Sequence, residues 1–377
     1  MTKQPRYAIA SPTSMGVRIT PEAREGVHTS DLFRMQSTSA ETNVLNIAAS
    51  LGQECLALTK FVEGSPVSAF IQRELRARNI RYEGISIPQE GPWGYRHQFN
   101  IADSGFGLVG PRVWNDRAGE VGRTLSIDEF DIERIFGQEG VDIQHISGLI
   151  AALSPETAVF CAELARRAKS YGTRVSFDLN YRASFWNDRE AELRRVFHEI
   201  ASLSDVLVGN EEDFQLALGL QGPDAGGKGL QDKIAAFQTM IETARKAYPN
   251  ARYFATTLRE VVHANEHLWG AILCADGAWV IEQPREHSRA RPNRRRRRLH
   301  WQAVWHRARL DAEACLHFGW ASGVLAASNL TDYATPADEE QIWSIYTGNA
   351  RLNDEQSGYR ANRTCRDGRK SRYECGE

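Results

Sequence analysis

A chain of 377 residues, with 42% hydrophobic and 25% charged residues, is long enough for one large α/β domain or two smaller ones. Its net charge of -2 gives no overall field that would attract nucleic acid or an anionic membrane. The sequence has no apolar run of membrane-spanning length and no signal-peptide layout at its start, which predicts a soluble cytoplasmic protein.

The cysteines are scattered along the chain, without a CxxC pair or the spacing of metal ligands. This pattern predicts free thiols in a reducing compartment, not a disulfide framework. They are Cys55, Cys161, Cys274, Cys315, Cys365 and Cys375.

Short apolar runs alternate with helical patterns from about residue 40 to residue 280. This order predicts a doubly wound, mainly parallel sheet with helices on both faces. The apolar spacing predicts helices over 40–52, 65–80 and 154–172, and strands over 141–150, 174–180, 205–210 and 252–258. Several of these strands stop at polar clusters, as strands do where their carboxyl ends open onto a site.

A different pattern covers residues 95–119, where polar and apolar residues alternate among many glycines. It predicts a small hairpin sheet over the site, a lid within residues 90–120. After Pro284 the chain changes again, because residues 285–309 contain ten arginines and no sustained apolar period. Helical patterns resume over 311–328 and 336–349, and the polar tail 353–377 is predicted to be disordered. We therefore expect one domain over residues 1–352.

The segment with the most informative chemistry is the strand that ends in Asp178, Asn180 and Arg182. It is similar to the Asp-x-Asn-x-Arg edge of keto-sugar kinases. A guanidinium binds a carboxylate through two parallel hydrogen bonds, so Arg182 suits a site for an acid sugar. The plain alternative is a surface arginine that follows a strand.

Asn43 lies near the start of the first predicted helix, where the ribokinase family carries a Gly-Gly-x-x-x-Asn sugar-binding motif. Thr38 and Ser39 replace the glycine pair here, so Asn43 is left as the hydrogen-bonding residue. A capped core helix would have the same pattern.

Residues 209–213, with Asn210 and Glu212, resemble the segment with which this family organises Mg²⁺ and phosphate. An acidic helix N-terminus is the alternative. Thr257 and Arg259 follow a predicted strand where these kinases present a nucleotide-binding loop, although an ordinary polar strand end would look the same.

Tyr95 and Arg117 in the predicted lid resemble the family's contacts to the keto acid, and Asp332 resembles the aspartate that closes the sugar site. The motifs occur in the family's order from Tyr7 to Leu352, with one gap. The chain therefore resembles the ribokinase (PfkB) family, and within it the 2-keto-3-deoxygluconate kinases.

This resemblance implies a ribokinase-like α/β fold and ATP-dependent phosphorylation of 2-keto-3-deoxygluconate or a related acid sugar, with ATP and Mg²⁺ as cofactors. The implied partner is a small sugar acid, and neither a membrane nor a nucleic acid is an implied partner. Whether the chain forms a homo-oligomer stays open. The implied substrate ligands are Asn43, Tyr95, Arg117, Arg182 and Asp332. The implied nucleotide and metal ligands are Asn210, Glu212, Thr257 and Arg259, with Glu212 at the metal.

The gap falls on the family's catalytic segment, Asp-Arg-x-Gly-Gly-Gly-Asp-Ala-Phe, which is replaced by the arginine-rich residues 291–301. In such a segment, bare glycine N–H groups form an anion hole for the transferring phosphate, and the aspartate accepts the substrate proton. No residue of this chain matches that aspartate, so the resemblance implies impaired phosphate transfer.

The genetic code offers an explanation of the arginine run. Residues 294–301 can be encoded by CGG CGG CGG CGA CGC CTT CAT TGG, a set chosen from the synonymous codons, and the same bases read one position later encode Gly-Gly-Gly-Asp-Ala-Phe-Ile-Gly. We hypothesise two compensating frameshifts, one between residues 284 and 291 and one near Arg309.

Other interpretations of the arginine run are a solvated basic loop, a nucleic-acid contact and a localisation patch. Two rival functions for the whole chain also stay open. One is a catalytically dead sugar-binding protein, and the other is a nucleic-acid-binding protein that uses the run.

The frameshift hypothesis is tested by sequencing the gene across the codons for residues 280–312. We expect one-base discrepancies at the two borders, or a GGC-rich reading frame one base later. A confirmed sequence without such a frame would contradict the hypothesis.

Overall fold

The computed structural model describes residues 4–22, 25–103, 112–222, 230–263, 266–288, 311–328, 331 and 333–348. Residues 289–309, Asp332 and the tail 353–377 lie outside the described residues, and with them most of the predicted arginine-rich segment and the predicted disordered tail.

The main sheet has nine strands in the order β15-β14-β13-β12-β11-β10-β1-β4-β6. Neighbours from β13 to β6 pair in parallel, and β14 and β15 add an antiparallel edge. The strands are β1 (Tyr7–Pro12), β4 (Cys55–Leu58), β6 (Ile80–Glu83), β10 (Val141–Ser147), β11 (Arg174–Asp178), β12 (Val206–Val208), β13 (Tyr253–His263), β14 (Glu266–Ala275) and β15 (Ala278–Ser288).

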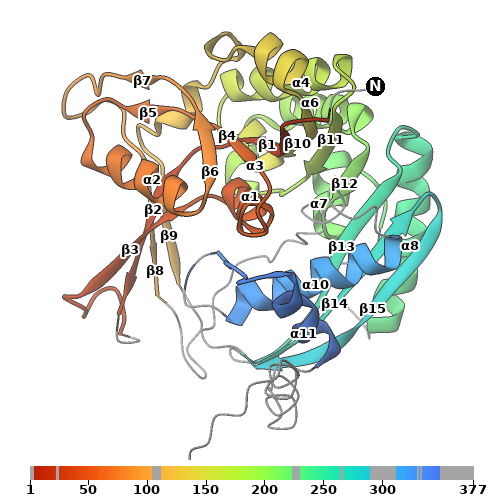
Figure 1. The fold of residues 1–377 in the computed structure, drawn as a ribbon. Helices are drawn as coiled ribbons and strands as arrows, with labels where there is room; N and C mark the ends of the chain where they lie inside the picture. Colours follow the sequence, from red (N-terminus) through yellow and green to blue (C-terminus); the bar gives the residue numbers. More distant parts are fainter. Residues whose placement is uncertain are drawn as a thin grey trace, which may run out of the picture.

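Helices cover both faces of this sheet, as the sequence predicts (Figure 1). The buried hydrophobic residues form two clusters. Residues of α4, α6 and α8 belong to one cluster, and residues of α1, α2, α10 and α11 belong to the other. The helices are α1 (Ala40–Ser50), α2 (Pro66–Ala77), α3 (Gly148–Ala151), α4 (Pro155–Ser170), α5 (Ala183–Trp186), α6 (Glu190–Leu203), α7 (Glu211–Leu218), α8 (Leu230–Ala247), α10 (Ala312–Ser328) and α11 (Glu339–Thr347). Three further turns are η1 (Val121–Thr124), η2 (Ile127–Glu129) and the π-helical η3 (Glu133–Glu139).

The chain changes direction across the sheet at β1. It passes from β1 to β4 and β6 on one side, and returns to β10 on the other side before it continues to β11, β12 and β13. The loops that leave β1 and β10 therefore run in opposite directions, and a crevice is expected between them at the carboxyl ends of the strands.

A separate sheet of four strands forms the lid, in the order β3-β2-β8-β9. It comprises β2 (Gly16–Pro21), β3 (Phe33–Thr38), β8 (Gln98–Ala102) and β9 (Val113–Asp116). The predicted hairpin within residues 90–120 corresponds to β8 and β9, which pair antiparallel. The prediction was incomplete because half of this sheet, β2 and β3, comes from the N-terminal region. A two-stranded sheet of β5 (Phe61–Val62) and β7 (Ser86–Ile87) completes the described strands.

The structure corrects two predicted strand ends. The strand predicted over 141–150 ends at Ser147, and the apolar residues after it form the short helix α3. An apolar run does not distinguish a buried strand from a buried helix. The pattern also predicts a break after Pro284, whereas β15 continues to Ser288. Proline fits there because β15 is the edge strand of the described sheet.

The thiol prediction is confirmed for Cys55, Cys161, Cys274 and Cys315, which are free and buried. The other two cysteines lie outside the described residues. Within the described part of the chain, no helix is both long enough and apolar enough to cross a membrane.

Candidate active site

The carboxyl ends of β1, β10 and β11 are joined by close backbone and side-chain contacts. Ser11 Oγ donates to the carbonyl oxygen of His145, which connects β1 to β10. A Cβ atom on Gly148, just after β10, would lie only 2.1 Å from the carbonyl oxygen of Leu179. Glycine is therefore required where the ends of β10 and β11 approach each other. These contacts fix the floor of the crevice.

Arg182 follows β11 at this floor. Asn180 adopts a left-handed backbone with φ of 40°, and its Nδ2 donates to Ser147 Oγ at 3.0 Å. Asparagine tolerates this conformation better than most residues. The chain then reaches Arg182, the N-cap of α5, whose Nη1 donates to the carbonyl oxygen of Tyr181 at 2.8 Å. The predicted carboxylate ligand is thus placed by a turn that is anchored to β10.

Arg117 approaches the same region from the lid. Its Nη1 donates to both carboxylate oxygens of Glu120, at 2.7 and 2.9 Å, and its guanidinium lies 5.5 Å from the ring centre of Phe185. Phe185 belongs to α5, and its N–H donates to the carbonyl oxygen of Arg182. Glu120 also accepts from Ser14, immediately after β1. The structure therefore places Arg117 against α5, the helix that Arg182 caps.

Asn43 lies on α1, whose start is fixed at the end of β1. Ser39 is the N-cap and accepts a hydrogen bond from the N–H of Thr42 at 2.9 Å, as predicted for a capped helix. Thr13, after β1, donates to Ser39 Oγ at 2.7 Å. Asn43 itself is half-buried in this first part of the helix.

Tyr95 is also half-buried and stands just before the lid strand β8. Its backbone N–H donates to the carbonyl oxygen of Gln89 at 2.8 Å, which closes the turn that leads into the lid.

Asn210 and Glu212 begin α7 at the carboxyl end of β12. Asn210 is the N-cap, and its Oδ1 accepts from the N–H of Asp213 at 2.8 Å. This oxygen already accepts a hydrogen bond that caps α7. Any role of the Asn210 amide in ligand binding would come in addition to this cap. Burial, followed by the negative charges of Glu190 and Glu212, raises the pKa of Tyr181. The charge of Glu212 therefore acts on the residue next to Arg182.

Asp213 is a positioning residue that the sequence reasoning missed. Its side chain is buried, one carboxylate oxygen accepts from the N–H of Tyr181 at 2.9 Å, and the other accepts from the N–H of Asn210 at 2.9 Å. One side chain thus links the Arg182 turn to the start of α7. The signal was present in the sequence, because an Asn followed three residues later by an acid is typical of a capping box.

The nucleotide-side prediction needs one correction. Thr257 and Arg259 lie within β13, which continues to His263, and not in a loop after a strand. The extension forms because β13 pairs with β14 along nearly its whole length, from Tyr253 to His263. Thr257 is half-buried; the side chain of Arg259 and all of Asp332 lie outside the described residues.

The described residues contain no group of three or more His, Cys, Asp or Glu side chains that could hold a metal ion by themselves. Magnesium in phosphate-transfer sites is commonly held by one or two carboxylates together with substrate phosphates and water. The half-buried carboxylate of Glu212 fits this kind of site, in which the nucleotide supplies the remaining oxygens.

The doubly wound sheet with its lid places Arg117 and Arg182 near the carboxyl ends of the strands, where ligands of such sheets bind. Residues 122–247 match the model of the pfkB family carbohydrate kinases. Together with the kinase relatives below, this match over residues 122–247 supports a carbohydrate kinase, a transferase.

Curated relatives agree with this assignment. The chain is similar to the 2-dehydro-3-deoxygalactonokinase of Haloferax volcanii, with 27% identity over 65% of this chain and 74% of that protein. It is also similar to the 2-dehydro-3-deoxygluconokinase of Bacillus subtilis, with 25% identity over 62% and 68%.

Solved structures share the fold. The crystal structure of 2-dehydro-3-deoxygluconokinase from Thermotoga maritima has a TM-score of 0.78 and 23% identity, over 90% of this chain and 99% of that one. A structure from Escherichia coli described as a Ribokinase II in complex with ATP and Mg²⁺ has a TM-score of 0.64 and 14% identity, over 91% and 99%.

We predict that Asp213→Asn destabilises the protein by about 1–3 kcal/mol, because the new amide N–H₂ must face a backbone N–H in a buried site. Urea denaturation measures the change. Glu211→Gln is the matched control, since it removes the same charge from the same helix turn without these bonds. Equal stabilities of the two variants would contradict the role of Asp213.

Proposed function

We propose that this kinase domain is built to bind 2-keto-3-deoxygluconate or a closely related keto acid sugar, in the cytoplasm. The observation that carries the proposal is that Arg117, from the lid, packs on Phe185 of α5, the helix that Arg182 caps at the end of β11. Two guanidinium groups at the switch-point crevice suit a substrate with a carboxylate. Neutral sugars offer no group that would need them.

The remaining residues have roles that suit this substrate. Asn43 would offer its amide to sugar hydroxyls, Tyr95 would contact the sugar from the lid, and Asp332 would close the site. The names of the curated relatives, which are kinases of 2-keto-3-deoxy sugars, support the same substrate class.

We place the nucleotide on the other side of the crevice, near Asn210, Glu212, Thr257 and Arg259. ATP with Mg²⁺ would supply the phosphoryl group and neutralise its charge. Glu212 would hold the metal through its carboxylate, and the start of α7 would present backbone N–H groups towards phosphate oxygens.

We further propose that phosphate transfer by this polypeptide is impaired. Residues 291–301 hold arginines where the family pattern places a glycine-rich anion hole and an aspartate base. A general base contributes about 10²–10⁴-fold to a rate, and one anion-hole donor about 10²–10³-fold. Binding of the sugar depends on other residues and is expected to survive.

We predict that 2-keto-3-deoxygluconate raises the melting temperature of the chain, and that Arg182→Gln weakens the sugar's affinity about tenfold or more through loss of a charge-assisted hydrogen bond. Differential scanning fluorimetry and calorimetric titration measure both effects. Arg166→Gln, which removes an exposed arginine of α4 that pairs with Glu163 and Glu199, is the control.

Fructose serves as a neutral comparison in the same titrations. If fructose binds as tightly as the keto acid, or if Arg182→Gln binds the keto acid normally, recognition of a carboxylate by this site is wrong.

A further inference from the structure

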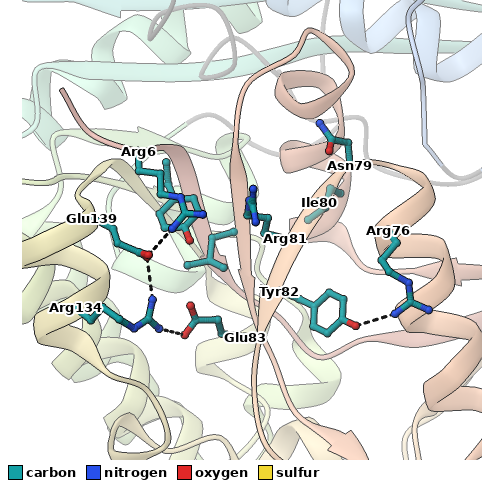
Figure 2. Close-up of a pocket in the computed structure, with 11 residues that line it drawn as sticks. Arg6, Arg76, Asn79, Ile80, Arg81, Tyr82, Glu83, Arg134 and Glu139 are labelled. Carbon is teal, nitrogen blue, oxygen red and sulfur yellow. Dashed lines mark hydrogen bonds and ion pairs between the residues drawn. The ribbon is translucent and has the colours of Figure 1, made fainter.

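A second cavity, of about 510 Å³, lies at the edge strand β6, away from the crevice (Figure 2). Arg6 and Tyr7 are at the amino end of β1, and Glu139 ends η3, two residues before β10 begins. The kinase crevice lies at the opposite, carboxyl ends of the same strands. A ligand in this cavity would therefore not touch the proposed sugar and nucleotide sites.

Most of the charge in the cavity is internally balanced. Arg134 pairs with Glu83 at 2.5 Å and with Glu139 at 2.9 Å, and Figure 2 shows Arg6 bound to the same Glu139. Arg81 pairs with Glu54 at 3.1 Å, which also accepts from Arg6. Three arginines of the cavity thus have carboxylate partners.

Arg76 is different. Of the four arginines that line the cavity, it is the one whose described partner is neutral: its Nη1 donates to the hydroxyl of Tyr82 at 2.9 Å. The ring of Tyr82 packs edge-on against buried Phe61, with ring centres 5.4 Å apart, which holds the hydroxyl in place. The guanidinium of Arg76 is therefore oriented before any ligand arrives, and its charge is not offset by a carboxylate among the described residues.

Tyr82 offers a hydrogen-bond donor beside Arg76. Because Tyr82 accepts from Arg76, its own O–H proton is available to an acceptor in the cavity. Asn79 also lines the cavity, but Figure 2 shows its side chain pointing away from Arg76 and Tyr82. Figure 2 shows Arg76 and Tyr82 together on the side of the cavity away from the Arg6, Glu139 and Arg134 chain.

We propose that this cavity binds a phosphate group, either free phosphate or a phosphate monoester, through Arg76 and Tyr82. A phosphate has several acceptor oxygens in a tetrahedral arrangement and a double negative charge, which matches an oriented guanidinium beside a neutral hydroxyl donor. The size of the cavity is in the usual range for small-molecule sites, so the carbon portion of a monoester can be accommodated.

The test is calorimetric titration of the full chain with inorganic phosphate and with glucose 6-phosphate, against sodium chloride at equal ionic strength. We expect binding by the wild type, at least about tenfold weaker binding by Arg76→Gln, and a partial loss in Tyr82→Phe. Arg73→Gln is the matched control, because Arg73 lies on the same helix, pairs with Glu74 and does not line the cavity. The two phosphate ligands distinguish free phosphate from a monoester.

Three results would overturn the proposal. Absence of binding beyond the chloride baseline would remove the site, and undiminished binding by Arg76→Gln would place the phosphate elsewhere, for example at the kinase crevice. An equal loss in Arg73→Gln would show a general effect of surface charge. None of these results bears on sugar binding at Arg182, so the two proposals fail separately.

Discussion

The reversal of the chain path at β1 is the constraint on which the rest of the structure depends. Because β4 and β10 flank β1 and the chain leaves in opposite directions, one crevice opens at the carboxyl ends of these strands. Each functional segment then has to reach that crevice: α1 through the Ser39 cap, the lid through Glu120 and Ser14, and β11 through Asn180. Asp213 holds the Arg182 turn against the start of α7.

The proposed substrate and nucleotide sides of the crevice thus share one buried carboxylate. If transfer is impaired as proposed, this arrangement would leave the binding geometry in place, since the family resemblance assigns the anion hole and the base to a different segment. The arginine-rich residues 291–301 occupy that segment in the sequence. A domain of this kind would bind its sugar and fail at the step that stabilises the transferring phosphate.

Much of the architecture could be predicted because its local signals agree with its tertiary packing. The helix that starts at Ser39, the helix from Ser154 and the strand that ends at Asp178 all have caps or apolar runs that match their burial. The strands β2 and β3 could not be predicted, because they gain their stability by pairing with β8, far away in the sequence. Likewise, β13 extends beyond Leu258 because β14 pairs with it.

Prediction of the site was less complete for a related reason. Arginine side chains at positions 117 and 182 favour anion binding, but only the structure places Arg117 against α5, the helix that Arg182 caps. Asp213 was missed because its importance lies in two backbone partners, one of them on a different strand end. The cavity at Arg76 has no sequence motif at all, since its residues come from β1, α2, β6 and η3.

The most direct measurement of the central claim is ADP release by the purified chain with ATP, Mg²⁺ and 2-keto-3-deoxygluconate, beside a restored variant in which Gly-Gly-Gly-Asp replaces residues 294–297. The account predicts turnover by the restored variant and a rate lower by about a thousandfold or more for the chain as it stands. Turnover by the unaltered chain within about tenfold of the restored variant would contradict the proposed impairment. Failure of both to release ADP would contradict the proposed substrate.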